Sequence, residues 1–411
     1  MLSKLIILAG TIYNIISLVM LFINYSSSTT AIDGSVHIVG LSKWGRLFGI
    51  YTDPNYAGIF CVTLILLAIY FFKTDKNKIS KIMYVLTIII QYLYIVFSGS
   101  RSALLCLSIG VVVYYILNFF TDNKMKLLNK IMVSSSITIM IPIIIIGGSK
   151  GCISFYNYCK NFNTNSTEII HNSQNIDLNI KSEIEIAQKN VQITNEDINK
   201  NEEIIDKEMK QPEISDIATE ENIKKDNSIN IVESTETVEL ISNSTEEKIT
   251  IGREDEINND ISNRRFDIWK SCFEVFKTSP IVGVSFRNMI LYSKDILPNT
   301  YIVNNDLSDF DAAHNMFFDV LVSQGAVGVL VFISFIIATL CLVFKNIKKT
   351  IKNDKNITII LVSICTQLLI SSMFLSHILY VNNITTFLFW LYFGYFVWFL
   401  QNKKNDISNM E

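Results

Sequence analysis

The sequence lacks the residue clusters that build compact metal or disulfide sites. Its 411 residues include seven cysteines but no CxxC pair, and no metal-ligating cluster is visible. The pattern therefore predicts neither a zinc site nor a disulfide framework. The cysteines that fall in apolar runs behave as small hydrophobic residues (Cys61, Cys106, Cys341 and Cys365). Cys152 and Cys159 lie outside these runs, and either a disulfide between them or two free thiols fits the sequence.

The long hydrophobic runs also lack the polar interruptions of a soluble core. Half of the residues are hydrophobic, and the mean hydropathy is +0.34. Each run approaches the length that crosses a hydrocarbon layer of about 30 Å. The first run has no small-residue cleavage site, so we interpret residues 1–24 as a span and not as a removed signal peptide. The chain is thus predicted to be an all-α, polytopic bundle with eight spans, at 5–24, 55–72, 82–98, 102–120, 128–147, 326–344, 357–376 and 384–400.

Lysine placement predicts the orientation of these spans. Lysines gather in the connections 73–81, 121–130 and 345–355 and in the tail 401–411. Eight spans place all four segments on one side, which the positive-inside rule makes cytoplasmic. The N-terminus is then inside, whereas 25–54, 148–325 and 377–383 lie outside. We therefore expect a multi-pass protein of the cytoplasmic (inner) membrane.

Arginine is scarce, and on this topology it occurs on one side only. The six arginines are Arg46, Arg101, Arg253, Arg264, Arg265 and Arg287, and all of them fall outside. In a lysine-rich chain this bias could arise by chance. The functional alternative is that arginine is retained where a planar, bidentate contact with an anion is needed.

The middle of the large outer loop lacks aromatic residues. Residues 161–260 hold 24 acidic and 9 basic residues, and Phe162 is the only aromatic one. Because such a segment buries too little apolar surface to offset chain ordering, we predict a disordered acidic insert. It is either an acidic tether at the cell surface or a tolerated insertion.

The two flanks of this insert have helical patterns. In residues 262–278, Phe266, Trp269, Phe273 and Phe276 form one aromatic face, with Ser262 or Asn263 as a cap. This segment is either a membrane-surface helix or a packed surface helix. A second short helix is predicted at 308–324, capped by Ser308 or Asp309 and separated from the following span by Gly325 and Gly328.

His314 falls in the first turns of that second predicted helix. The positive end of a helix lowers the pKa of a histidine and favours its neutral ring, which can act as a general base. Asp311 could orient the ring. The alternative is a structural histidine that binds a backbone carbonyl.

Two other outer segments carry arginine next to turn residues. Ser98–Ser102 is a polar turn between two apolar spans, where Arg101 is either a snorkelling anchor or functional. Residues 44–58 place Arg46 and an Asp-Pro-Asn turn at the mouth of the second span.

Together these segments resemble the bacterial O-antigen ligase and O-antigen polymerase membrane glycosyltransferases. The matching pieces are RLFGIYTDPNYAG at 46–58, SGSRSALL at 98–105, RRFDIWKSCFEVFKTSPIVGVSFRN at 264–288 and HNMFFDVLVSQGAVGVLVF at 314–332. Their order matches the family, and the resemblance covers most of the chain except 160–260. Family members usually have more than eight spans, so a truncated chain, a shorter branch and an inactive fragment all stay open.

The resemblance implies an inverting, GT-C-type transferase that works on the extracytoplasmic face. The donor would be a glycan on undecaprenyl diphosphate, the acceptor a sugar hydroxyl on a glycan or glycolipid, and a chain-length regulator a further partner. Neither a metal or nucleotide cofactor nor a nucleic-acid partner is expected. The family's essential histidine corresponds to His314. Its diphosphate-binding arginines correspond to Arg101 and Arg265, with Arg46, Arg264 and Asn315 as further candidates for substrate binding.

Several functions remain open at this point. The Ile-, Asn- and Lys-rich composition suggests an AT-rich genome, and some such bacteria make no lipopolysaccharide, which favours a polymerase of O-antigen, capsule or exopolysaccharide over a ligase. A transporter or flippase of lipid-linked glycan is the alternative from another class, although no clear internal repeat supports it. A third hypothesis is a non-catalytic partner whose acidic loop binds a molecule outside.

Overall fold

The computed structural model describes residues 1–30, 36–122, 125–160, 264–305, 310 and 312–402. The chain divides into two compact units, Met1–Asn157 with Ile249–Glu411, and Tyr158–Lys248. Only residues 158–160 of the second unit are described, so the fold below is that of the first. Several predictions lie outside the described residues: the insert 161–260, the caps Ser262, Asn263, Ser308 and Asp309, the orienting role of Asp311, and the basic tail.

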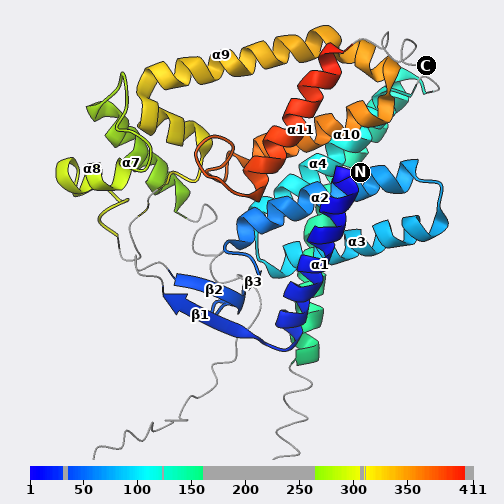
Figure 1. Cartoon of the computed structure of the whole chain (residues 1–411), viewed down its shortest axis with the longest axis horizontal. Helices are drawn as coiled ribbons and strands as arrows, with labels where there is room; N and C mark the ends of the chain where they lie inside the picture. Colours follow the sequence, from blue (N-terminus) through cyan, green and yellow to red (C-terminus); the bar gives the residue numbers. More distant parts are fainter. Residues whose placement is uncertain (31–35, 123–124, 161–263, 306–309, 311, 403–411) are drawn as a thin grey trace, which may run out of the picture. The chain divides into compact units, whose positions relative to one another are not determined.

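The described residues are mostly helical, with one small sheet. The N-terminal elements are α1 (Leu2–Phe22), β1 (Ser26–Thr30), β2 (Val36–Leu41), β3 (Leu47–Gly49), α2 (Pro54–Thr74), α3 (Lys78–Phe97) and α4 (Arg101–Phe120). A long helix, Leu127–Lys160, follows. The C-terminal elements are α7 (Arg265–Thr278), α8 (Met289–Ile296), α9 (Met316–Asn353), α10 (Lys355–Ser371) and α11 (Ile384–Gln401). Figure 1 shows these elements.

The prediction of a polytopic helical membrane protein is confirmed. Within the described ranges, seven helices are long and apolar enough to cross a membrane: α1, α2, α3, α4, Leu127–Lys160, α9 and α11. The seventh predicted span, 357–376, is shorter than expected. Its helix, α10, has 17 residues and ends at Ser371, and at 1.5 Å per residue it reaches only about 25 Å.

The helix that contains the fifth predicted span is longer than expected. Its length decides whether Cys152 and Cys159 form a disulfide or are free thiols. The predicted span 128–147 is part of a helix that continues to Lys160 and therefore includes both Cys152 and Cys159. Seven residues of α-helix separate two Cα atoms by about 10 Å, beyond the reach of a disulfide. Both cysteines are free thiols.

The segment 25–54 contains a sheet that the sequence did not predict. Strands β1, β2 and β3 pair antiparallel in that order. The sheet is joined to the helices by two hydrogen bonds, from the amide of Ile50 to Ser17 Oγ (3.2 Å) and from the hydroxyl of Tyr94 to the carbonyl of Phe48 (3.0 Å). Because β1 is a run of serine and threonine with mostly exposed side chains, it shows no alternation of hydrophobic residues.

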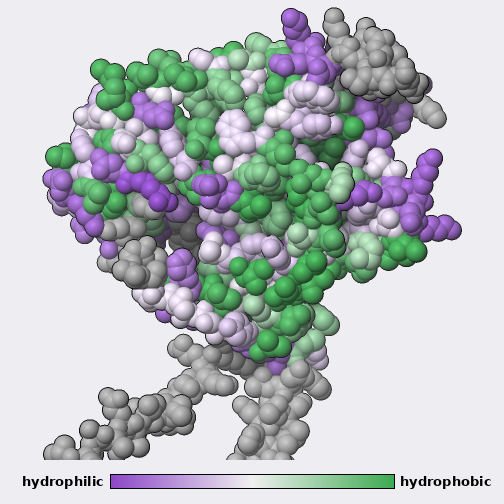
Figure 2. Space-filling view, in the orientation of Figure 1, coloured by the Kyte–Doolittle hydropathy of each residue, from purple (hydrophilic) through white to green (hydrophobic). Residues whose placement is uncertain are grey.

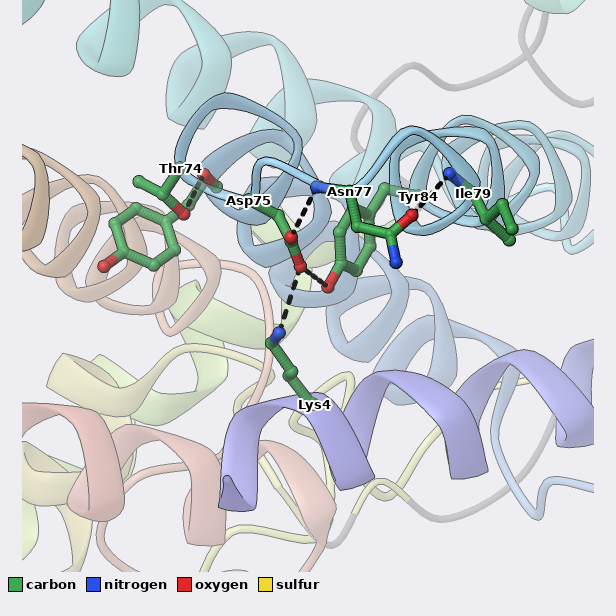
Figure 3. A network of polar contacts seen from close by, with 7 residues as sticks. Lys4, Thr74, Asp75, Asn77, Ile79 and Tyr84 are labelled. Atoms are coloured by element: carbon green, nitrogen blue, oxygen red, sulfur yellow. Dashed lines mark hydrogen bonds and ion pairs between the residues drawn. The ribbon is translucent and has the colours of Figure 1, made fainter.

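One end of the bundle, here called the lysine end, collects the lysine-rich connections. Figure 3 shows Lys4 of α1 bound to Asp75 after α2 (3.2 Å), with the hydroxyl of Tyr84 donating to the same carboxylate (3.3 Å). The Nζ of Lys73 donates to the Asn118 side chain (2.6 Å), and that of Lys355 to the Asn118 carbonyl (3.3 Å). The starts of α1, α3 and α10 therefore lie together with the ends of α2 and α4.

The helices hold one another through buried polar contacts as well as apolar packing. The side-chain amide of Asn14 in α1 donates to Gln91 of α3 and to the Cys61 sulfur of α2 (3.1 Å), and its Oδ1 accepts from the hydroxyl of Tyr51 (2.9 Å). Gln367 of α10 donates to Thr63 of α2 (2.8 Å). In lipid, such contacts join helices whose apolar surfaces gain little from leaving the hydrocarbon phase.

Outward faces of the long helices remain apolar. Large hydrophobic side chains are exposed on α1 (Leu8, 54%), on Leu127–Lys160 (Ile144, 63%) and on α9 (Phe344, 75%). Figure 2 shows broad hydrophobic areas, drawn in green, on the face in view. Faces of this kind are expected on a multi-pass membrane protein, where lipid covers them.

Helix α9 bends sharply, as Figure 1 shows. The bend is at Gly325 (φ 61°, ψ −158°), which confirms the predicted break at this residue. The loop after α7 fills the break: Val284 and Ser285 donate backbone hydrogen bonds to Val322 (2.8 Å) and Ser323 (3.0 Å), and Ala326 donates to Pro280 (2.8 Å). The bend therefore docks α7 and its loop against the first arm of α9.

Two glycines permit this docking, and their substitution tests it. Both Gly283 (φ +69°) and Gly325 (φ +61°) have left-handed backbones, and an added Cβ would lie 2.4 Å from the Val322 carbonyl oxygen or 2.5 Å from the Ile281 carbonyl, respectively. The left-handed conformation alone costs an L-residue about 1–2 kcal/mol. We expect Gly283→Ala and Gly325→Ala each to lower the free energy of unfolding of the purified protein by at least that amount.

The matched control is Gly394→Ala in α11, where nothing lies within 4 Å of the added Cβ. Because alanine favours a helix over glycine by up to about 1 kcal/mol, this variant should be as stable as the wild type or slightly more so. Equal stability of Gly283→Ala and Gly394→Ala would contradict the docking.

Candidate active site

The guanidinium of Arg46 joins the first two arginine-bearing segments. Its Nε donates to the carbonyl of Ser98 (2.9 Å), and its terminal nitrogen donates to Asn55 Oδ1 (2.9 Å). Ser98 ends α3, and Ser100 caps α4 by accepting from the amide of Ala103 (3.3 Å). Arg46 thus braces the turn that positions Arg101.

Arg101 is the first residue of α4 and is partly buried. The N-terminus of a helix carries a positive partial charge, which adds to the charge of the guanidinium and favours an anion beside it. The structure therefore brings Arg46 and Arg101, which are far apart in the sequence, to one polar turn at the end of the bundle opposite the lysine end. We call this end the arginine end.

His314 lies before a helix and not within one. The predicted helix at 308–324 begins only at Met316, with Asn315 as its N-cap. Asn315 Oδ1 accepts from the amides of Phe317 (2.9 Å) and Phe318 (3.4 Å). The helix starts later than expected because Asn315 supplies the cap, and the backbone of His314 is left-handed (φ 51°).

The residues on either side of His314 are held by four hydrogen bonds. The amide of Ala313 donates to Asp319 Oδ1 (2.9 Å), and the carbonyl of Ala313 accepts from Trp269 Nε1 of α7 (3.0 Å). The side-chain amide of Asn315 donates to the carbonyl of Met373 (3.1 Å), and the backbone amide of Met316 donates to the carbonyl of Ser372 (2.9 Å). These bonds fix the chain on both sides of His314, whose side chain is partly buried.

Arg265 begins α7 and reaches the same region. Its guanidinium lies over the ring of Phe374, 5.6 Å from the ring centroid. Arg264 precedes α7 with a left-handed backbone (φ 63°), so it takes the N-cap position expected for Ser262 or Asn263, without a side-chain cap bond. Its guanidinium donates to the hydroxyl of Tyr301 (3.2 Å), and it is exposed. Arg264 therefore lies further toward the surface than Arg265.

The segment between α10 and α11 joins the elements that carry these residues. The sequence predicted it to be the end of one span and a short outer loop. Residues 372–383, between α10 and α11, form what we call the 372–383 connection. Its carbonyls at Ser372 and Met373 hold the His314 segment, and Phe374 lies under Arg265. The carbonyl of Ser376 accepts from the hydroxyl of Tyr56 (3.2 Å), the residue after Asn55. One connection thus links the His314 segment, α7 and the start of α2.

His377 is buried and stabilises the conformation of the 372–383 connection. Its Nδ1 faces the carbonyl of Leu375 (3.2 Å), its Nε2 lies 2.9 Å from Ser371 Oγ, and its ring meets that of Tyr56 edge-on. Because a carbonyl only accepts, Nδ1 carries the proton of a neutral ring. Burial lowers the pKa of His377 to about 4. A second histidine, which directly follows Ser376 after a long apolar run, is a sequence signal that could have marked this segment.

The described residues contain no group of three or more His, Cys, Asp or Glu side chains that could hold a metal. Asn315 uses its side chain to start α9 and to bind Met373, so its role in substrate binding stays a prediction. Arg253 lies outside the described residues, and Arg287 is exposed on the loop between α7 and α8.

Comparison with known proteins assigns the family. A family model described as O-antigen ligase matches residues 82–333, which is more than half of the chain. The chain belongs to the O-antigen ligase family. The matched range includes Arg101, Arg265 and His314, but it ends before the 372–383 connection. No match was found among curated proteins or among solved structures.

The buried neutral histidine of this family member predicts a pH-dependent stability. Its pKa is about 4 in the folded protein and about 6.5 when unfolded, so the unfolded state binds more protons between these values. The stabilisation by neutral His377 is complete above pH 6.5 and is lost as the pH falls toward 4. It amounts to on the order of 3 kcal/mol.

We therefore expect the destabilisation caused by His377→Asn to be largest at pH 7 and to shrink as the pH approaches 4.5. Unfolding titrations of both proteins at several pH values measure this difference. His37→Asn, at an exposed position on β2, should show no such trend. A destabilisation by His377→Asn that is constant with pH would mean that the folded protein does not keep this ring neutral.

Proposed function

We propose that this protein transfers a glycan from an undecaprenyl-diphosphate donor to a sugar hydroxyl on the outer face of the cytoplasmic membrane. Membership of the O-antigen ligase family supports glycan transfer in polysaccharide assembly. The single observation that carries the residue assignment is the set of four hydrogen bonds that hold the residues beside His314. Two of them go to the 372–383 connection, which also contacts Arg265 through Phe374.

The chemistry needs a base and an anion clamp. The acceptor oxygen attacks the anomeric carbon of the donor sugar from the face opposite the diphosphate. Its proton passes to the neutral imidazole of His314, while the electron pair of the breaking carbon–oxygen bond moves onto the diphosphate. Inversion at the anomeric carbon follows from this single displacement. No step requires a metal or a nucleotide.

The arginines stabilise the leaving group. As the sugar departs, negative charge grows on the diphosphate, and donors already in place for that charge can contribute several kcal/mol. Arg101 and Arg265 are the two proposed clamps. Arg46 is assigned a supporting part, because its side chain donates to Ser98 and Asn55 and so braces the turn before Arg101. Arg264 adds positive charge nearer the surface.

The backbone of His314 fits a preorganised base. A non-glycine residue in the left-handed region costs on the order of 1–3 kcal/mol, and such strain tends to occur at functional sites. Here the flanking hydrogen bonds maintain that conformation.

The topology supports an outer active site. Lysine-rich connections meet at one end of the bundle and the arginine end is opposite. The positive-inside rule places the lysine end in the cytoplasm. His314, Arg101 and Arg265 are then on the extracytoplasmic face, where a lipid-linked glycan is presented after translocation.

We assign polymerisation of lipid-linked repeats, for O-antigen, capsule or exopolysaccharide, as the first candidate. The composition suggests an AT-rich genome, which favours a polymer made without lipid A. A ligase that transfers the glycan to a lipid A core or another acceptor is the second candidate, and the description of the matching family favours it. The transporter hypothesis gains no support from that match.

Replacing His314 by alanine tests the proposal. In cells that depend on this gene for their surface glycan, we expect His314→Ala to lower long-chain product at least 100-fold, because general base catalysis typically contributes 10²–10⁴-fold. Gel analysis of the glycan, with immunoblotting of the membrane fraction, measures product and protein separately. A ladder of repeats made by the wild type indicates a polymerase, and one transferred glycan on a new acceptor indicates a ligase.

The matched control is His37→Ala on the exposed strand β2, which should make normal glycan. Normal chains from His314→Ala, with both variants present at equal levels in the membrane, would refute the assignment of the base.

A further inference from the structure

The loop after α7 borders a cavity that the proposed chemistry does not use. The cavity is open, has a volume of about 600 Å³, and lies between the end of α7, the loop, α8 and the first arm of α9. It is lined by Thr278, Ser279, Val282, Gly283, Val284, Ser285, Asn288, Tyr292 and Ser323. None of these residues carries a charge, and five of them have a hydroxyl or amide group besides the phenol of Tyr292.

This lining suits a neutral sugar and not a phosphate. Hydroxyl and amide groups both donate and accept hydrogen bonds, as the hydroxyls of a sugar ring require. Tyr292 adds an aromatic ring with a polar end. A diphosphate would instead require cationic donors, which the cavity wall lacks.

The cavity is built on a fixed frame. Val284 and Ser285 are tied to Val322 and Ser323 by backbone hydrogen bonds of 2.8 and 3.0 Å. The hydroxyl of Tyr292 donates to Thr278 Oγ1 (3.0 Å). Ser285 has a left-handed backbone (φ 74°), an unfavourable conformation for a non-glycine residue. The frame holds Ser285 and the neighbouring polar groups in place before any ligand arrives.

The distance to His314 fits a single chain of sugars. Ser323 lies on the same arm of α9 that begins beside His314. The eight residues from Asn315 to Ser323 span about 12 Å at 1.5 Å per residue. A short oligosaccharide with one end at His314 therefore reaches the cavity.

We propose that this cavity binds the distal, neutral sugars of the glycan whose reacting end lies at His314. The inference rests on the proposed glycan transfer and adds a second recognition site to it. The chain could belong to the acceptor or to the donor, and both present the same hydroxyl chemistry. Specificity for the repeating unit would then be set at the cavity, away from the reacting atoms.

Binding of a free oligosaccharide to the purified full-length protein in nanodiscs tests this site. The probe is the neutral oligosaccharide released by mild acid from the surface polysaccharide of the producing cell, and calorimetry measures its dissociation constant. We expect Tyr292→Ala to weaken binding at least tenfold and Ser285→Ala about threefold. Tyr292→Phe keeps the ring and should stay within threefold of the wild type. His314→Ala should bind normally.

The matched control is Asp295→Asn, an exposed α8 residue that does not line the cavity and should bind as the wild type does. Ser285 is exposed, so its variant keeps the test valid if Tyr292→Ala fails to fold. No binding by the wild type, wild-type affinity in both Tyr292→Ala and Ser285→Ala, or loss of binding in His314→Ala would overturn the proposal.

The outcome is separable from that of the proposed function. Transfer retained by His314→Ala would refute the base while leaving the binding result intact. Loss of transfer in His314→Ala, with normal binding by both cavity variants, would refute the cavity alone. In transfer assays, a raised KM for acceptor or for donor after Tyr292→Ala identifies which glycan occupies the site.

Discussion

Hydrogen bonds to the carbonyls that follow α10 determine how the arginine end is assembled. The last carbonyls of a helix have no partner within it. After Ser371 the chain turns instead of continuing, and the next carbonyls, at Ser372, Met373 and Ser376, accept hydrogen bonds from Met316, Asn315 and Tyr56. The donors belong to α2 and to the start of α9, whereas the acceptors follow α10. One irregular segment therefore fixes the positions of α2 and α9 relative to each other.

This arrangement accounts for the conformation of His314. A left-handed histidine is unfavourable alone, and it persists because Ala313, Asn315 and Met316 are all bonded to other elements. Preorganisation of this kind reduces the rearrangement needed when charge moves during a reaction. Arg265, stacked over Phe374, is positioned by the same segment. The proposed base and one of the proposed anion clamps therefore share a support.

The sequence predicted the helical membrane fold because long apolar runs have few alternative structures. The break at Gly325 was also predictable, since glycine interrupts an otherwise apolar helix. The late start of α9 was not, because Asn315 and the residues near 308 are equally good caps by residue type, and a sequence does not show the bond from Asn315 to Met373.

The role of the 372–383 connection in joining the site could not be predicted from the sequence, for a different reason. Residues 372–376 are apolar enough to extend the span, and backbone carbonyls leave no trace in a sequence. Arg46 was predicted as a ligand from its residue type, whereas its bonds to Ser98 and Asn55 show that it also braces the turn before Arg101. Residue type therefore predicts where a positive charge lies. Only the tertiary contacts show whether the side chain also holds another part of the protein in place.

The most direct test of this account is a double-mutant cycle between Tyr56→Phe and Asn315→Ser. Each removes one donor to the 372–383 connection, and serine still caps α9. The quantity measured is the single-turnover rate of glycan transfer by the purified protein from a lipid-diphosphate oligosaccharide. We predict that the two losses are coupled by at least about 0.5 kcal/mol, since both anchor one segment. Additive effects, or no transfer by the wild type, would contradict the account.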